Sequence, residues 1–226
     1  MSRTSEPDRD CPLCPRLAAF RESNREIYPG FFNAPAPSFG DRSARMLVVG
    51  LAPGLKGANR TGRPFTGDYA GDLLYATLAK YGFANDRFDA RPDDGLELHD
   101  CRIANAVRCV PPQNKPIGAE VAACRPFLRN EIDALPRLKV IVALGGLSHG
   151  AILAALGLRR SAWKFAHAAQ HDILADGREL VLADSYHCSR YNTNTGRLTP
   201  EMFETVFAGV RALIGPSPPS GTVAHT

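Results

Sequence analysis

Four of the six cysteines are spaced so that their thiolates could hold one metal centre. Cys11 and Cys14 form a C-x2-C pair, and fourteen residues separate Cys109, at the end of an apolar run, from Cys124 in a helical pattern. Four soft thiolates bind zinc or an iron–sulfur cluster. The second pair departs from the repeated C-x2-C of zinc ribbons, which favours the cluster and leaves zinc as the alternative. The plainer interpretation is four separate thiols, because cysteine also behaves as a small apolar residue.

A glycine-rich stretch, GLAPGLKGANRTGRPFTGDYAG, directly follows the apolar run RMLVVG. Neither the phosphate-binding pattern G-x-x-x-x-G-K-S/T nor the dinucleotide fingerprint G-x-G-x-x-G fits it. Its glycines permit close backbone approach, its arginines can meet phosphates, its phenylalanine offers a flat face for a base, and its aspartate supplies a carboxylate. Such a set predicts a pocket for one nucleobase of a nucleic-acid strand. The residues concerned are Gly54, Arg60, Arg63, Phe65 and Asp68.

The elements that must position these groups alternate along the chain. Apolar runs typical of strands buried on both faces span 45–50, 101–107, 138–146 and 179–185. Helical patterns span 15–27, 70–81, 118–133, 146–156 and 200–214. This alternation predicts an α/β protein with three α/β/α layers around a mostly parallel sheet.

Each predicted strand runs into a polar or glycine-rich segment. These segments read GLAPG, RCVPPQNKP, GGLSHG and SYHCSRYNTNTG. Ligands of open parallel sheets bind beyond the carboxyl ends of the strands. We therefore expect the four loops to build a single site.

Length and composition set broad limits. The 226 residues, 44% hydrophobic and 22% charged, suit one domain, which we expect over 1–214, followed by a disordered tail at 215–226. No apolar run is long enough for a membrane span or a signal peptide, so we expect a cytoplasmic protein. The net charge of +4 is compatible with a polyanionic partner. No apolar helix stripe is left over, so we expect a monomer.

Three motifs and the four-cysteine pattern occur in the order found in a known family. The stretch GLAPGLKGANRTGRPFTGD, together with RCVPPQNKP and SYHCSRYNTNTGRLT, resembles the iron–sulfur uracil-DNA glycosylases, most closely the family 5 or UDGb type. The resemblance extends from Cys11 to about Phe207. It implies a central four-stranded parallel sheet and a 4Fe–4S cluster on Cys11, Cys14, Cys109 and Cys124. It also implies DNA containing uracil, or deaminated purines such as hypoxanthine and xanthine, as the substrate.

The resemblance also implies roles for individual side chains. Phe65 would stack on a flipped uracil, while Asn105 or Asn114 would hydrogen-bond the polar edge of the base. His187 would donate to the departing base, and Asn192, which matches a second polar position in the same loop, would be a further catalytic residue. Residues expected to grip DNA are Arg60, Arg63, Lys115, Arg190 and Arg197.

Two departures from related glycosylases concern the catalytic loops. The segment from Gly50 to Pro53 contains neither a carboxylate nor an amide, a mark of the family 5 type, in which Asp68 is implicated instead. Asp68 would also suit a helix N-cap, the structural alternative for its role. Cys188 stands where the related motif often reads His-Pro-Ser.

Two other functions remain as alternatives to a glycosylase. One is an iron–sulfur redox or sensor protein, and the other is a non-catalytic nucleic-acid-binding module.

Overall fold

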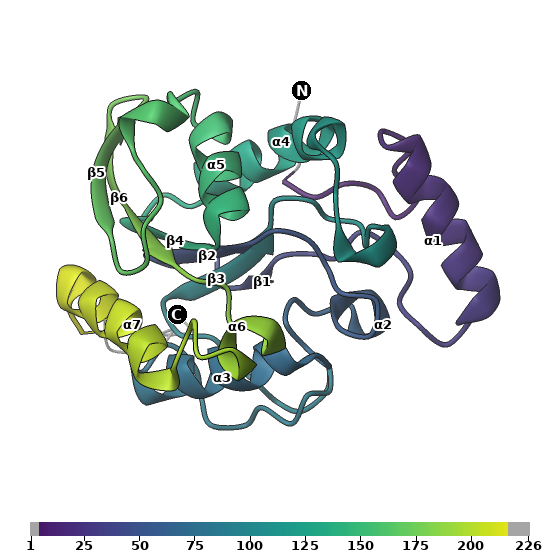
Figure 1. The fold of residues 1–226 in the computed structure, drawn as a ribbon, viewed down its shortest axis with the longest axis horizontal. Helices are drawn as coiled ribbons and strands as arrows, with labels where there is room; N and C mark the ends of the chain where they lie inside the picture. Colours follow the sequence, from purple (N-terminus) through teal and green to yellow (C-terminus); the bar gives the residue numbers. More distant parts are fainter. Residues whose placement is uncertain (1–4, 217–226) are drawn as a thin grey trace, which may run out of the picture.

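One mixed sheet organises the chain in the computed structural model, which describes residues 5–216 (Figure 1). The strand order is β1-β3-β2-β4-β6-β5. The four parallel strands are β2 (Met46–Gly50), β3 (Cys101–Asn105), β4 (Val140–Leu144) and β6 (Arg178–Ser185). Two antiparallel strands, β1 (Phe39–Gly40) and β5 (Gln170–Ala175), flank them at the edges. The predicted four-stranded parallel sheet is therefore confirmed as the centre of a six-stranded one.

Helices cover both faces of the sheet and complete the three layers (Figure 1). The long helices are α1 (Pro15–Ile27), α3 (Tyr69–Lys80), α4 (Gly118–Asp133), α5 (Gly146–Ala155) and α7 (Pro200–Ile214). Short helical segments are α2 (Ala58–Thr61), η1 (Pro112–Asn114), η2 (Arg160–Ala162) and α6 (Arg190–Asn194). All five helices predicted from the sequence are present.

Alternation along β2 shows why the sheet is buried on both sides. Met46 and Val48 pack with α3 and α7 in one core, whereas Leu47 and Val49 pack with α4 and α5 in the other. Successive strand side chains point to opposite faces, so an uninterrupted apolar run is what a doubly covered strand requires. α1 lies outside these layers, where Leu17 packs against Val107 in the segment after β3.

No helix of residues 5–216 is both long and apolar enough to cross a membrane. Residues 217–226 of the predicted tail lie outside the described part of the chain.

Candidate active site

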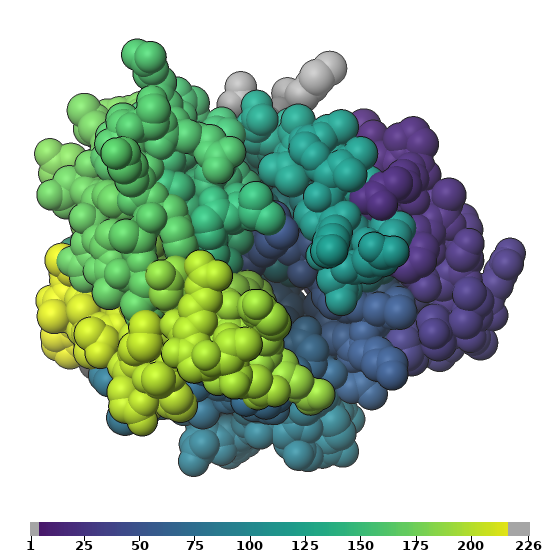
Figure 2. Space-filling view, in the orientation of Figure 1, coloured from purple at the N-terminus to yellow at the C-terminus, as the bar shows by residue number. Residues whose placement is uncertain are grey.

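A cavity of about 330 Å³ opens at the carboxyl edge of the parallel strands. Figure 2 shows the hollow near the centre of one face, where surfaces from blue, teal and yellow-green parts of the chain meet. Predicted site residues that line it are Gly54, Phe65, Asp68, Asn105, Asn114, His187 and Arg190. Three of the four predicted loops therefore meet in one pocket.

Glycines in the first loop allow the functional side chains to approach the backbone. A Cβ atom at Gly57 would lie 2.2 Å from Oδ2 of Asp68. A Cβ atom at Gly50 would lie 2.5 Å from Oδ1 of Asn105 and 2.7 Å from Cζ of Phe65. Any larger residue at either position would displace these groups. The glycine density of the stretch thus serves close packing around Asp68, Asn105 and Phe65.

Phe65 forms an aromatic wall of the pocket. Its backbone has a φ of 52°, in the left-handed region that residues with a Cβ rarely occupy. The side chain is largely buried, and the centre of its ring lies 6.0 Å from that of His187 at an interplanar angle of 33°. This conformation fixes a flat apolar face beside the imidazole.

Two asparagine amides supply polar groups at different depths. Asn105 ends β3 and is only 3% exposed, whereas Asn114 lies at the exposed end of η1 with a φ of 57°. Within residues 5–216, neither side-chain amide hydrogen-bonds another protein group, so both are available to a ligand. The structure brings both candidates for base recognition to the pocket.

Asp68 places a buried carboxylate in the pocket wall. Burial raises the pKa of this carboxyl, and the backbone N–H groups of Gly71 and Ala70 oppose that shift without cancelling it. Its Oδ1 atom is buried without a hydrogen-bond partner in the described chain. Asp68 occupies the N-cap position of α3, but its side chain makes no cap hydrogen bond. The first-turn N–H groups of α3 therefore favour the ionised carboxylate, although no side-chain cap hydrogen bond forms.

His187 follows β6 and faces Phe65 across the pocket. Burial lowers the pKa of its imidazole to about 4, so the ring is neutral at physiological pH. A Cβ atom at Gly145, just after β4, would lie 3.7 Å from the Cβ of His187. The remaining predicted loop, GGLSHG after β4, therefore supports the site by packing against His187.

Asn192 does not line the pocket, contrary to its predicted catalytic role. Its Nδ2 donates a hydrogen bond of 2.8 Å to the backbone oxygen of His187, and its own N–H donates to the Oγ of Ser189. The short helix α6 turns this side chain back onto the loop. Asn192 is consequently a residue that positions His187.

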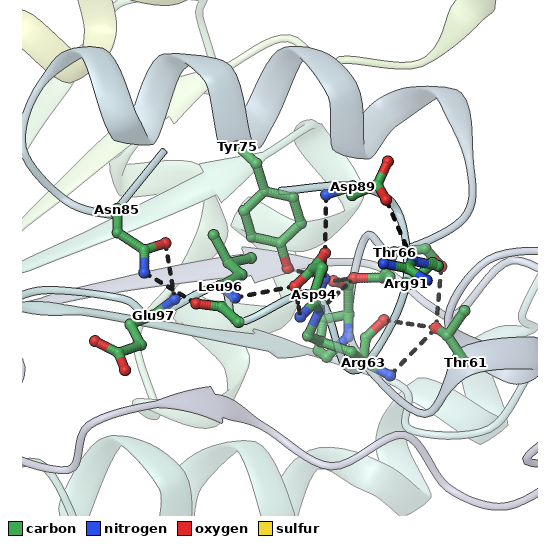
Figure 3. A network of polar contacts seen from close by, with 12 residues as sticks. Thr61, Arg63, Thr66, Tyr75, Asn85, Asp89, Arg91, Asp94, Leu96 and Glu97 are labelled. Carbon is green, nitrogen blue, oxygen red and sulfur yellow. Dashed lines mark hydrogen bonds and ion pairs between the residues drawn. The ribbon is translucent and has the colours of Figure 1, made fainter. Parts of the chain in front are cut away.

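Arg63 is buried beneath the pocket loop and cannot contact DNA as predicted. Figure 3 shows its guanidinium paired with both carboxylate oxygens of Asp94, at 2.8 and 2.7 Å. The guanidinium also lies 5.3 to 5.9 Å from the ring centres of Phe39, Tyr75 and Phe88. Sequence spacing alone did not distinguish this structural arginine from an exposed one.

We expect Arg63→Ala to destabilise the fold without weakening DNA binding. Removing one partner of a buried ion pair costs about 3–5 kcal/mol. Arg63 also holds the pKa of the Asp94 carboxyl well below its usual range, so the stability that this pair contributes is present at neutral pH and lost in strong acid. Denaturant unfolding measures the loss. A DNA affinity that falls with unchanged stability would contradict this structural role.

The remaining predicted DNA contacts are exposed. Arg60, Lys115 and Arg190 make no ion pair with described residues and are open to solvent. The guanidinium of Arg190 lies 5.1 Å from the ring centre of Tyr69, and that of Arg197 lies 4.7 Å from the ring centre of Tyr186. These cations are free to meet phosphates around the pocket.

The four predicted ligand cysteines gather between α1, α4 and the segment after β3. All four are free thiols, and Cys109 and Cys124 pack with Cys14 in a small apolar cluster. Burial, followed by the proximity of other cysteines of the set, raises the pKa of Cys14 to about 11 and that of Cys109 to about 12. Nη1 of Arg21 donates to Sγ of Cys109 at 3.9 Å. Residues distant in sequence therefore form one thiol site.

A buried cluster behind the His187 loop was not predicted. Oδ1 of Asp184 lies 2.7 Å from Nδ1 of His149, and its Oδ2 lies 3.1 Å from Nε2 of His171. The other nitrogen of His149 meets the carbonyl oxygen of Trp163 at 3.0 Å. These three side chains are close enough to hold a metal ion, yet both ring nitrogens of His149 are already hydrogen-bonded. These hydrogen bonds connect the end of β6 to α5 and β5, and connect α5 to the segment before β5.

The fold and the pocket together define a class of protein. The profile of the Uracil DNA glycosylase superfamily matches residues 37–211, which include the pocket residues described above. The chain belongs to this superfamily.

Relatives place the chain more narrowly, within the type-5 branch. A type-5 uracil-DNA glycosylase from Thermus thermophilus is 46% identical over 210 residues, covering 91% of this chain and 94% of its own length. The type-5 enzyme of Pyrobaculum aerophilum is 38% identical, with 91% and 90% covered. A type-4 uracil-DNA glycosylase from Sulfurisphaera tokodaii is 30% identical, with 75% and 72% covered.

Proposed function

We propose that this chain, a uracil-DNA glycosylase and hence a hydrolase of N-glycosyl bonds, excises uracil from DNA by flipping the nucleotide into the pocket bounded by Phe65 and His187. The observation that carries the proposal is the meeting, in one cavity, of an aromatic face, free amides, a neutral imidazole and a buried carboxylate. A base must leave the stack for such groups to reach it. DNA repair is the context in which this reaction operates.

Recognition of the base uses the pocket walls. The ring of Phe65 stacks on the flipped base, and the amides of Asn105 and Asn114 match donors and acceptors on its polar edge. Because an amide offers both kinds of group, it can bind uracil in one orientation and a deaminated purine in another. The absence of a carboxylate or amide between Gly50 and Pro53 leaves that loop without a polar group dedicated to uracil. We therefore include hypoxanthine and xanthine among the substrates.

Hydrolysis breaks the C1′–N1 bond, and its electron pair leaves with the base. The neutral imidazole of His187 donates a hydrogen bond to the base as negative charge develops there. Asp68, which lines the pocket, orients a water molecule toward C1′ with its carboxylate and accepts its proton as the new C–O bond forms. The departing base takes up a proton from solvent, which balances the reaction.

The four cysteines are proposed to hold a 4Fe–4S cluster. The second pair of cysteines departs from the repeated C-x2-C of zinc ribbons, which favours the cluster over zinc. When bound, it would tie the segment before α1 to α4 and to the loop that carries Asn114.

We expect Cys124→Ser to lose the cluster and to lower the melting temperature. The holoprotein should contain about four iron atoms per chain and show brown colour, because each thiolate anchors one iron. The matched control is Cys101→Ser, since Cys101 is buried in β3 away from the thiol site. Metal analysis of purified protein provides the measurement. One zinc and no iron per wild-type chain would replace the cluster with a zinc site.

The substrate range is tested by single-turnover assays on oligonucleotides that each carry one uracil, hypoxanthine or xanthine. Release of all three bases by the wild-type protein supports the broad assignment. Release of uracil alone would restrict the function to uracil, and release of none would contradict the proposed function.

A further inference from the structure

Arg21 on α1 has a different kind of partner from the other buried arginines. The arginines that are buried within residues 5–216 are Arg21, Arg45, Arg63, Arg102 and Arg108. All but Arg21 form an ion pair with a carboxylate side chain that is no more than 5% exposed, and these carboxylates belong to Asp100, Asp94 and Glu131. Nε of Arg21 instead lies 3.6 Å from Glu22, whose side chain is 56% exposed. Arg21 is therefore a buried cation whose carboxylate partner faces solvent.

The donors of Arg21 are directed at the thiol site. Its Nη1 donates to Sγ of Cys109 at 3.9 Å, and Nη1 and Nη2 both donate to the carbonyl oxygen of Cys11 at 3.3 Å. Its Nε is buried and has no hydrogen-bond partner in the described chain. A guanidinium carries five N–H donors and a permanent positive charge. Arg21 thus brings a buried charge and a spare donor to two of the predicted ligand cysteines.

The surroundings of Arg21 fit a metal centre held by thiolates. A buried cation is costly unless an anion lies beside it. Neutral thiols do not supply that anion. Four thiolates around a zinc ion or an iron–sulfur cluster leave a net negative charge on the centre, and their sulfurs accept hydrogen bonds. Either centre would therefore satisfy both the charge and the donors of Arg21.

The other buried charges beside the thiols already have partners. Nη2 of Arg108, the residue before Cys109, lies 3.5 Å from Oε2 of Glu131. Glu120 on α4 accepts hydrogen bonds from Nε and Nη2 of Arg16 at 2.7 and 2.8 Å. These pairs largely neutralise themselves. Within the described part of the chain, Arg21 is therefore the buried cation left to balance a negatively charged centre.

We propose that Arg21 is the counter-ion of the metal centre, donating to the Cys109 thiolate and offsetting part of the negative charge of the bound centre. This inference rests on the proposed metal site and deepens it by assigning a residue that retains the metal. Arg21 acts through the ligands and does not line the base pocket. If the centre is a cluster, the same charge favours its reduced form, because reduction makes a negative centre more negative.

The first test follows the loss of bound metal from the holoprotein to excess EDTA. Arg21→Gln keeps an N–H donor and removes the charge, whereas Arg21→Lys keeps the charge. We expect Arg21→Gln to lose metal about 10–100-fold faster than wild type, the range by which removing a hydrogen-bond partner of a metal ligand weakens binding. Arg21→Lys should stay within a few-fold of wild type. Wild-type retention by Arg21→Gln, or equally fast loss from both variants, would overturn the counter-ion role.

Arg129→Gln is the matched control for metal loss. Arg129 follows Cys124 on α4, but its ion pairs are with Asp133 and Asp176. Its variant should retain metal as the wild type does. The comparison applies to iron or to zinc, because four thiolates make either centre negative. A wild-type protein that binds neither metal would contradict the metal site itself and the role of Arg21 with it, whereas release of uracil from DNA reports on the proposed function separately.

The second test measures the midpoint reduction potential of the cluster in the same proteins. Arg21→Gln should shift the potential to more negative values, because the reduced cluster loses a neighbouring cation, and Arg21→Lys should shift it less. Arg129→Gln should leave it unchanged. A role confined to linking α1 to the carbonyl oxygen of Cys11 predicts no such dependence on charge. An unchanged or more positive potential in Arg21→Gln would overturn the proposal.

Discussion

Replacing Asp68 by asparagine is expected to lower the single-turnover rate of uracil release by roughly 10³-fold, because a positioned general base contributes about 10²–10⁴-fold. The substitution keeps the shape of the side chain and removes its charge. Asp68 lines the pocket that holds the base, and its carboxyl is desolvated enough for its pKa to be raised. A group that orients water has these properties.

The pH profile provides a second readout for Asp68. Because burial raises the pKa of this carboxyl, its catalytic ionised form is lost at a higher pH than for an exposed aspartate. The wild-type rate should therefore fall on the acid side, and the contribution of Asp68 to that fall should vanish in Asp68→Asn. The ionised form of Asp68 that catalysis needs is unfavourable for folding stability. A raised folded-state pKa means that ionised Asp68 destabilises the fold at neutral pH, so Asp68→Asn should melt at a higher temperature than wild type.

Asp72→Asn is the matched control for the rate at neutral pH, while in the pH profile it removes a charge that raises the pKa of Asp68. Asp72 lies in the first turn of α3 but is exposed and does not line the pocket. Its variant should keep the wild-type rate. Release of uracil by Asp68→Asn at the wild-type rate would contradict a role in orienting water and would leave Asp68 with the role of shaping the loop.

Replacing His187 by alanine is expected to lower kcat by about 10²–10³-fold, the usual cost of removing one preorganised donor to developing charge. DNA affinity should stay within a few-fold, because the lost interaction belongs to the transition state. His99→Ala is the control, since His99 is exposed and outside the pocket. Equal losses of binding and of rate would assign His187 to ground-state binding instead.

The imidazole of His187 also affects stability in mild acid. Its pKa falls from about 6.5 in the unfolded chain to about 4 in the fold because the site is buried. The unfolded state therefore takes up a proton that the folded state does not, and stability declines as the pH drops from 6.5 toward 4. His187→Ala should show a smaller decline over this window in urea titrations at a series of pH values.

Most of the sheet could be predicted because its central strands are covered on both faces and read as uninterrupted apolar runs. β5 escaped prediction because it forms an edge, and its sequence QHDILA alternates exposed and buried positions. The helices were recognisable where local signals were strong, as at α7, whose N-cap Thr199 accepts a hydrogen bond from the N–H of Met202. Edge strands and single-turn helices depend on tertiary packing that short patterns do not encode.

The pocket residues could be predicted because topology brings the carboxyl ends of parallel strands together. The burial and pairing of individual side chains could not be predicted. For this reason Arg63 and Asn192 differ from their predicted roles. Arg63 has the same spacing in its loop as an exposed cation, but Asp94, distant in sequence, binds it inside the fold. Asn192 lies near His187 in sequence, but α6 directs its amide to a backbone oxygen. The contact of Asp184 with His149 joins β6 to α5, a pairing that the local sequence patterns do not predict.

The most direct test of the central claim is to incubate the cluster-loaded wild-type protein with an oligonucleotide carrying one uracil and to quantify free base and abasic sites together by mass spectrometry. Cleavage of the C1′–N1 bond in this pocket predicts equal amounts of free uracil and intact-backbone abasic product. Folded, iron-containing protein that leaves the uracil in place would contradict the account.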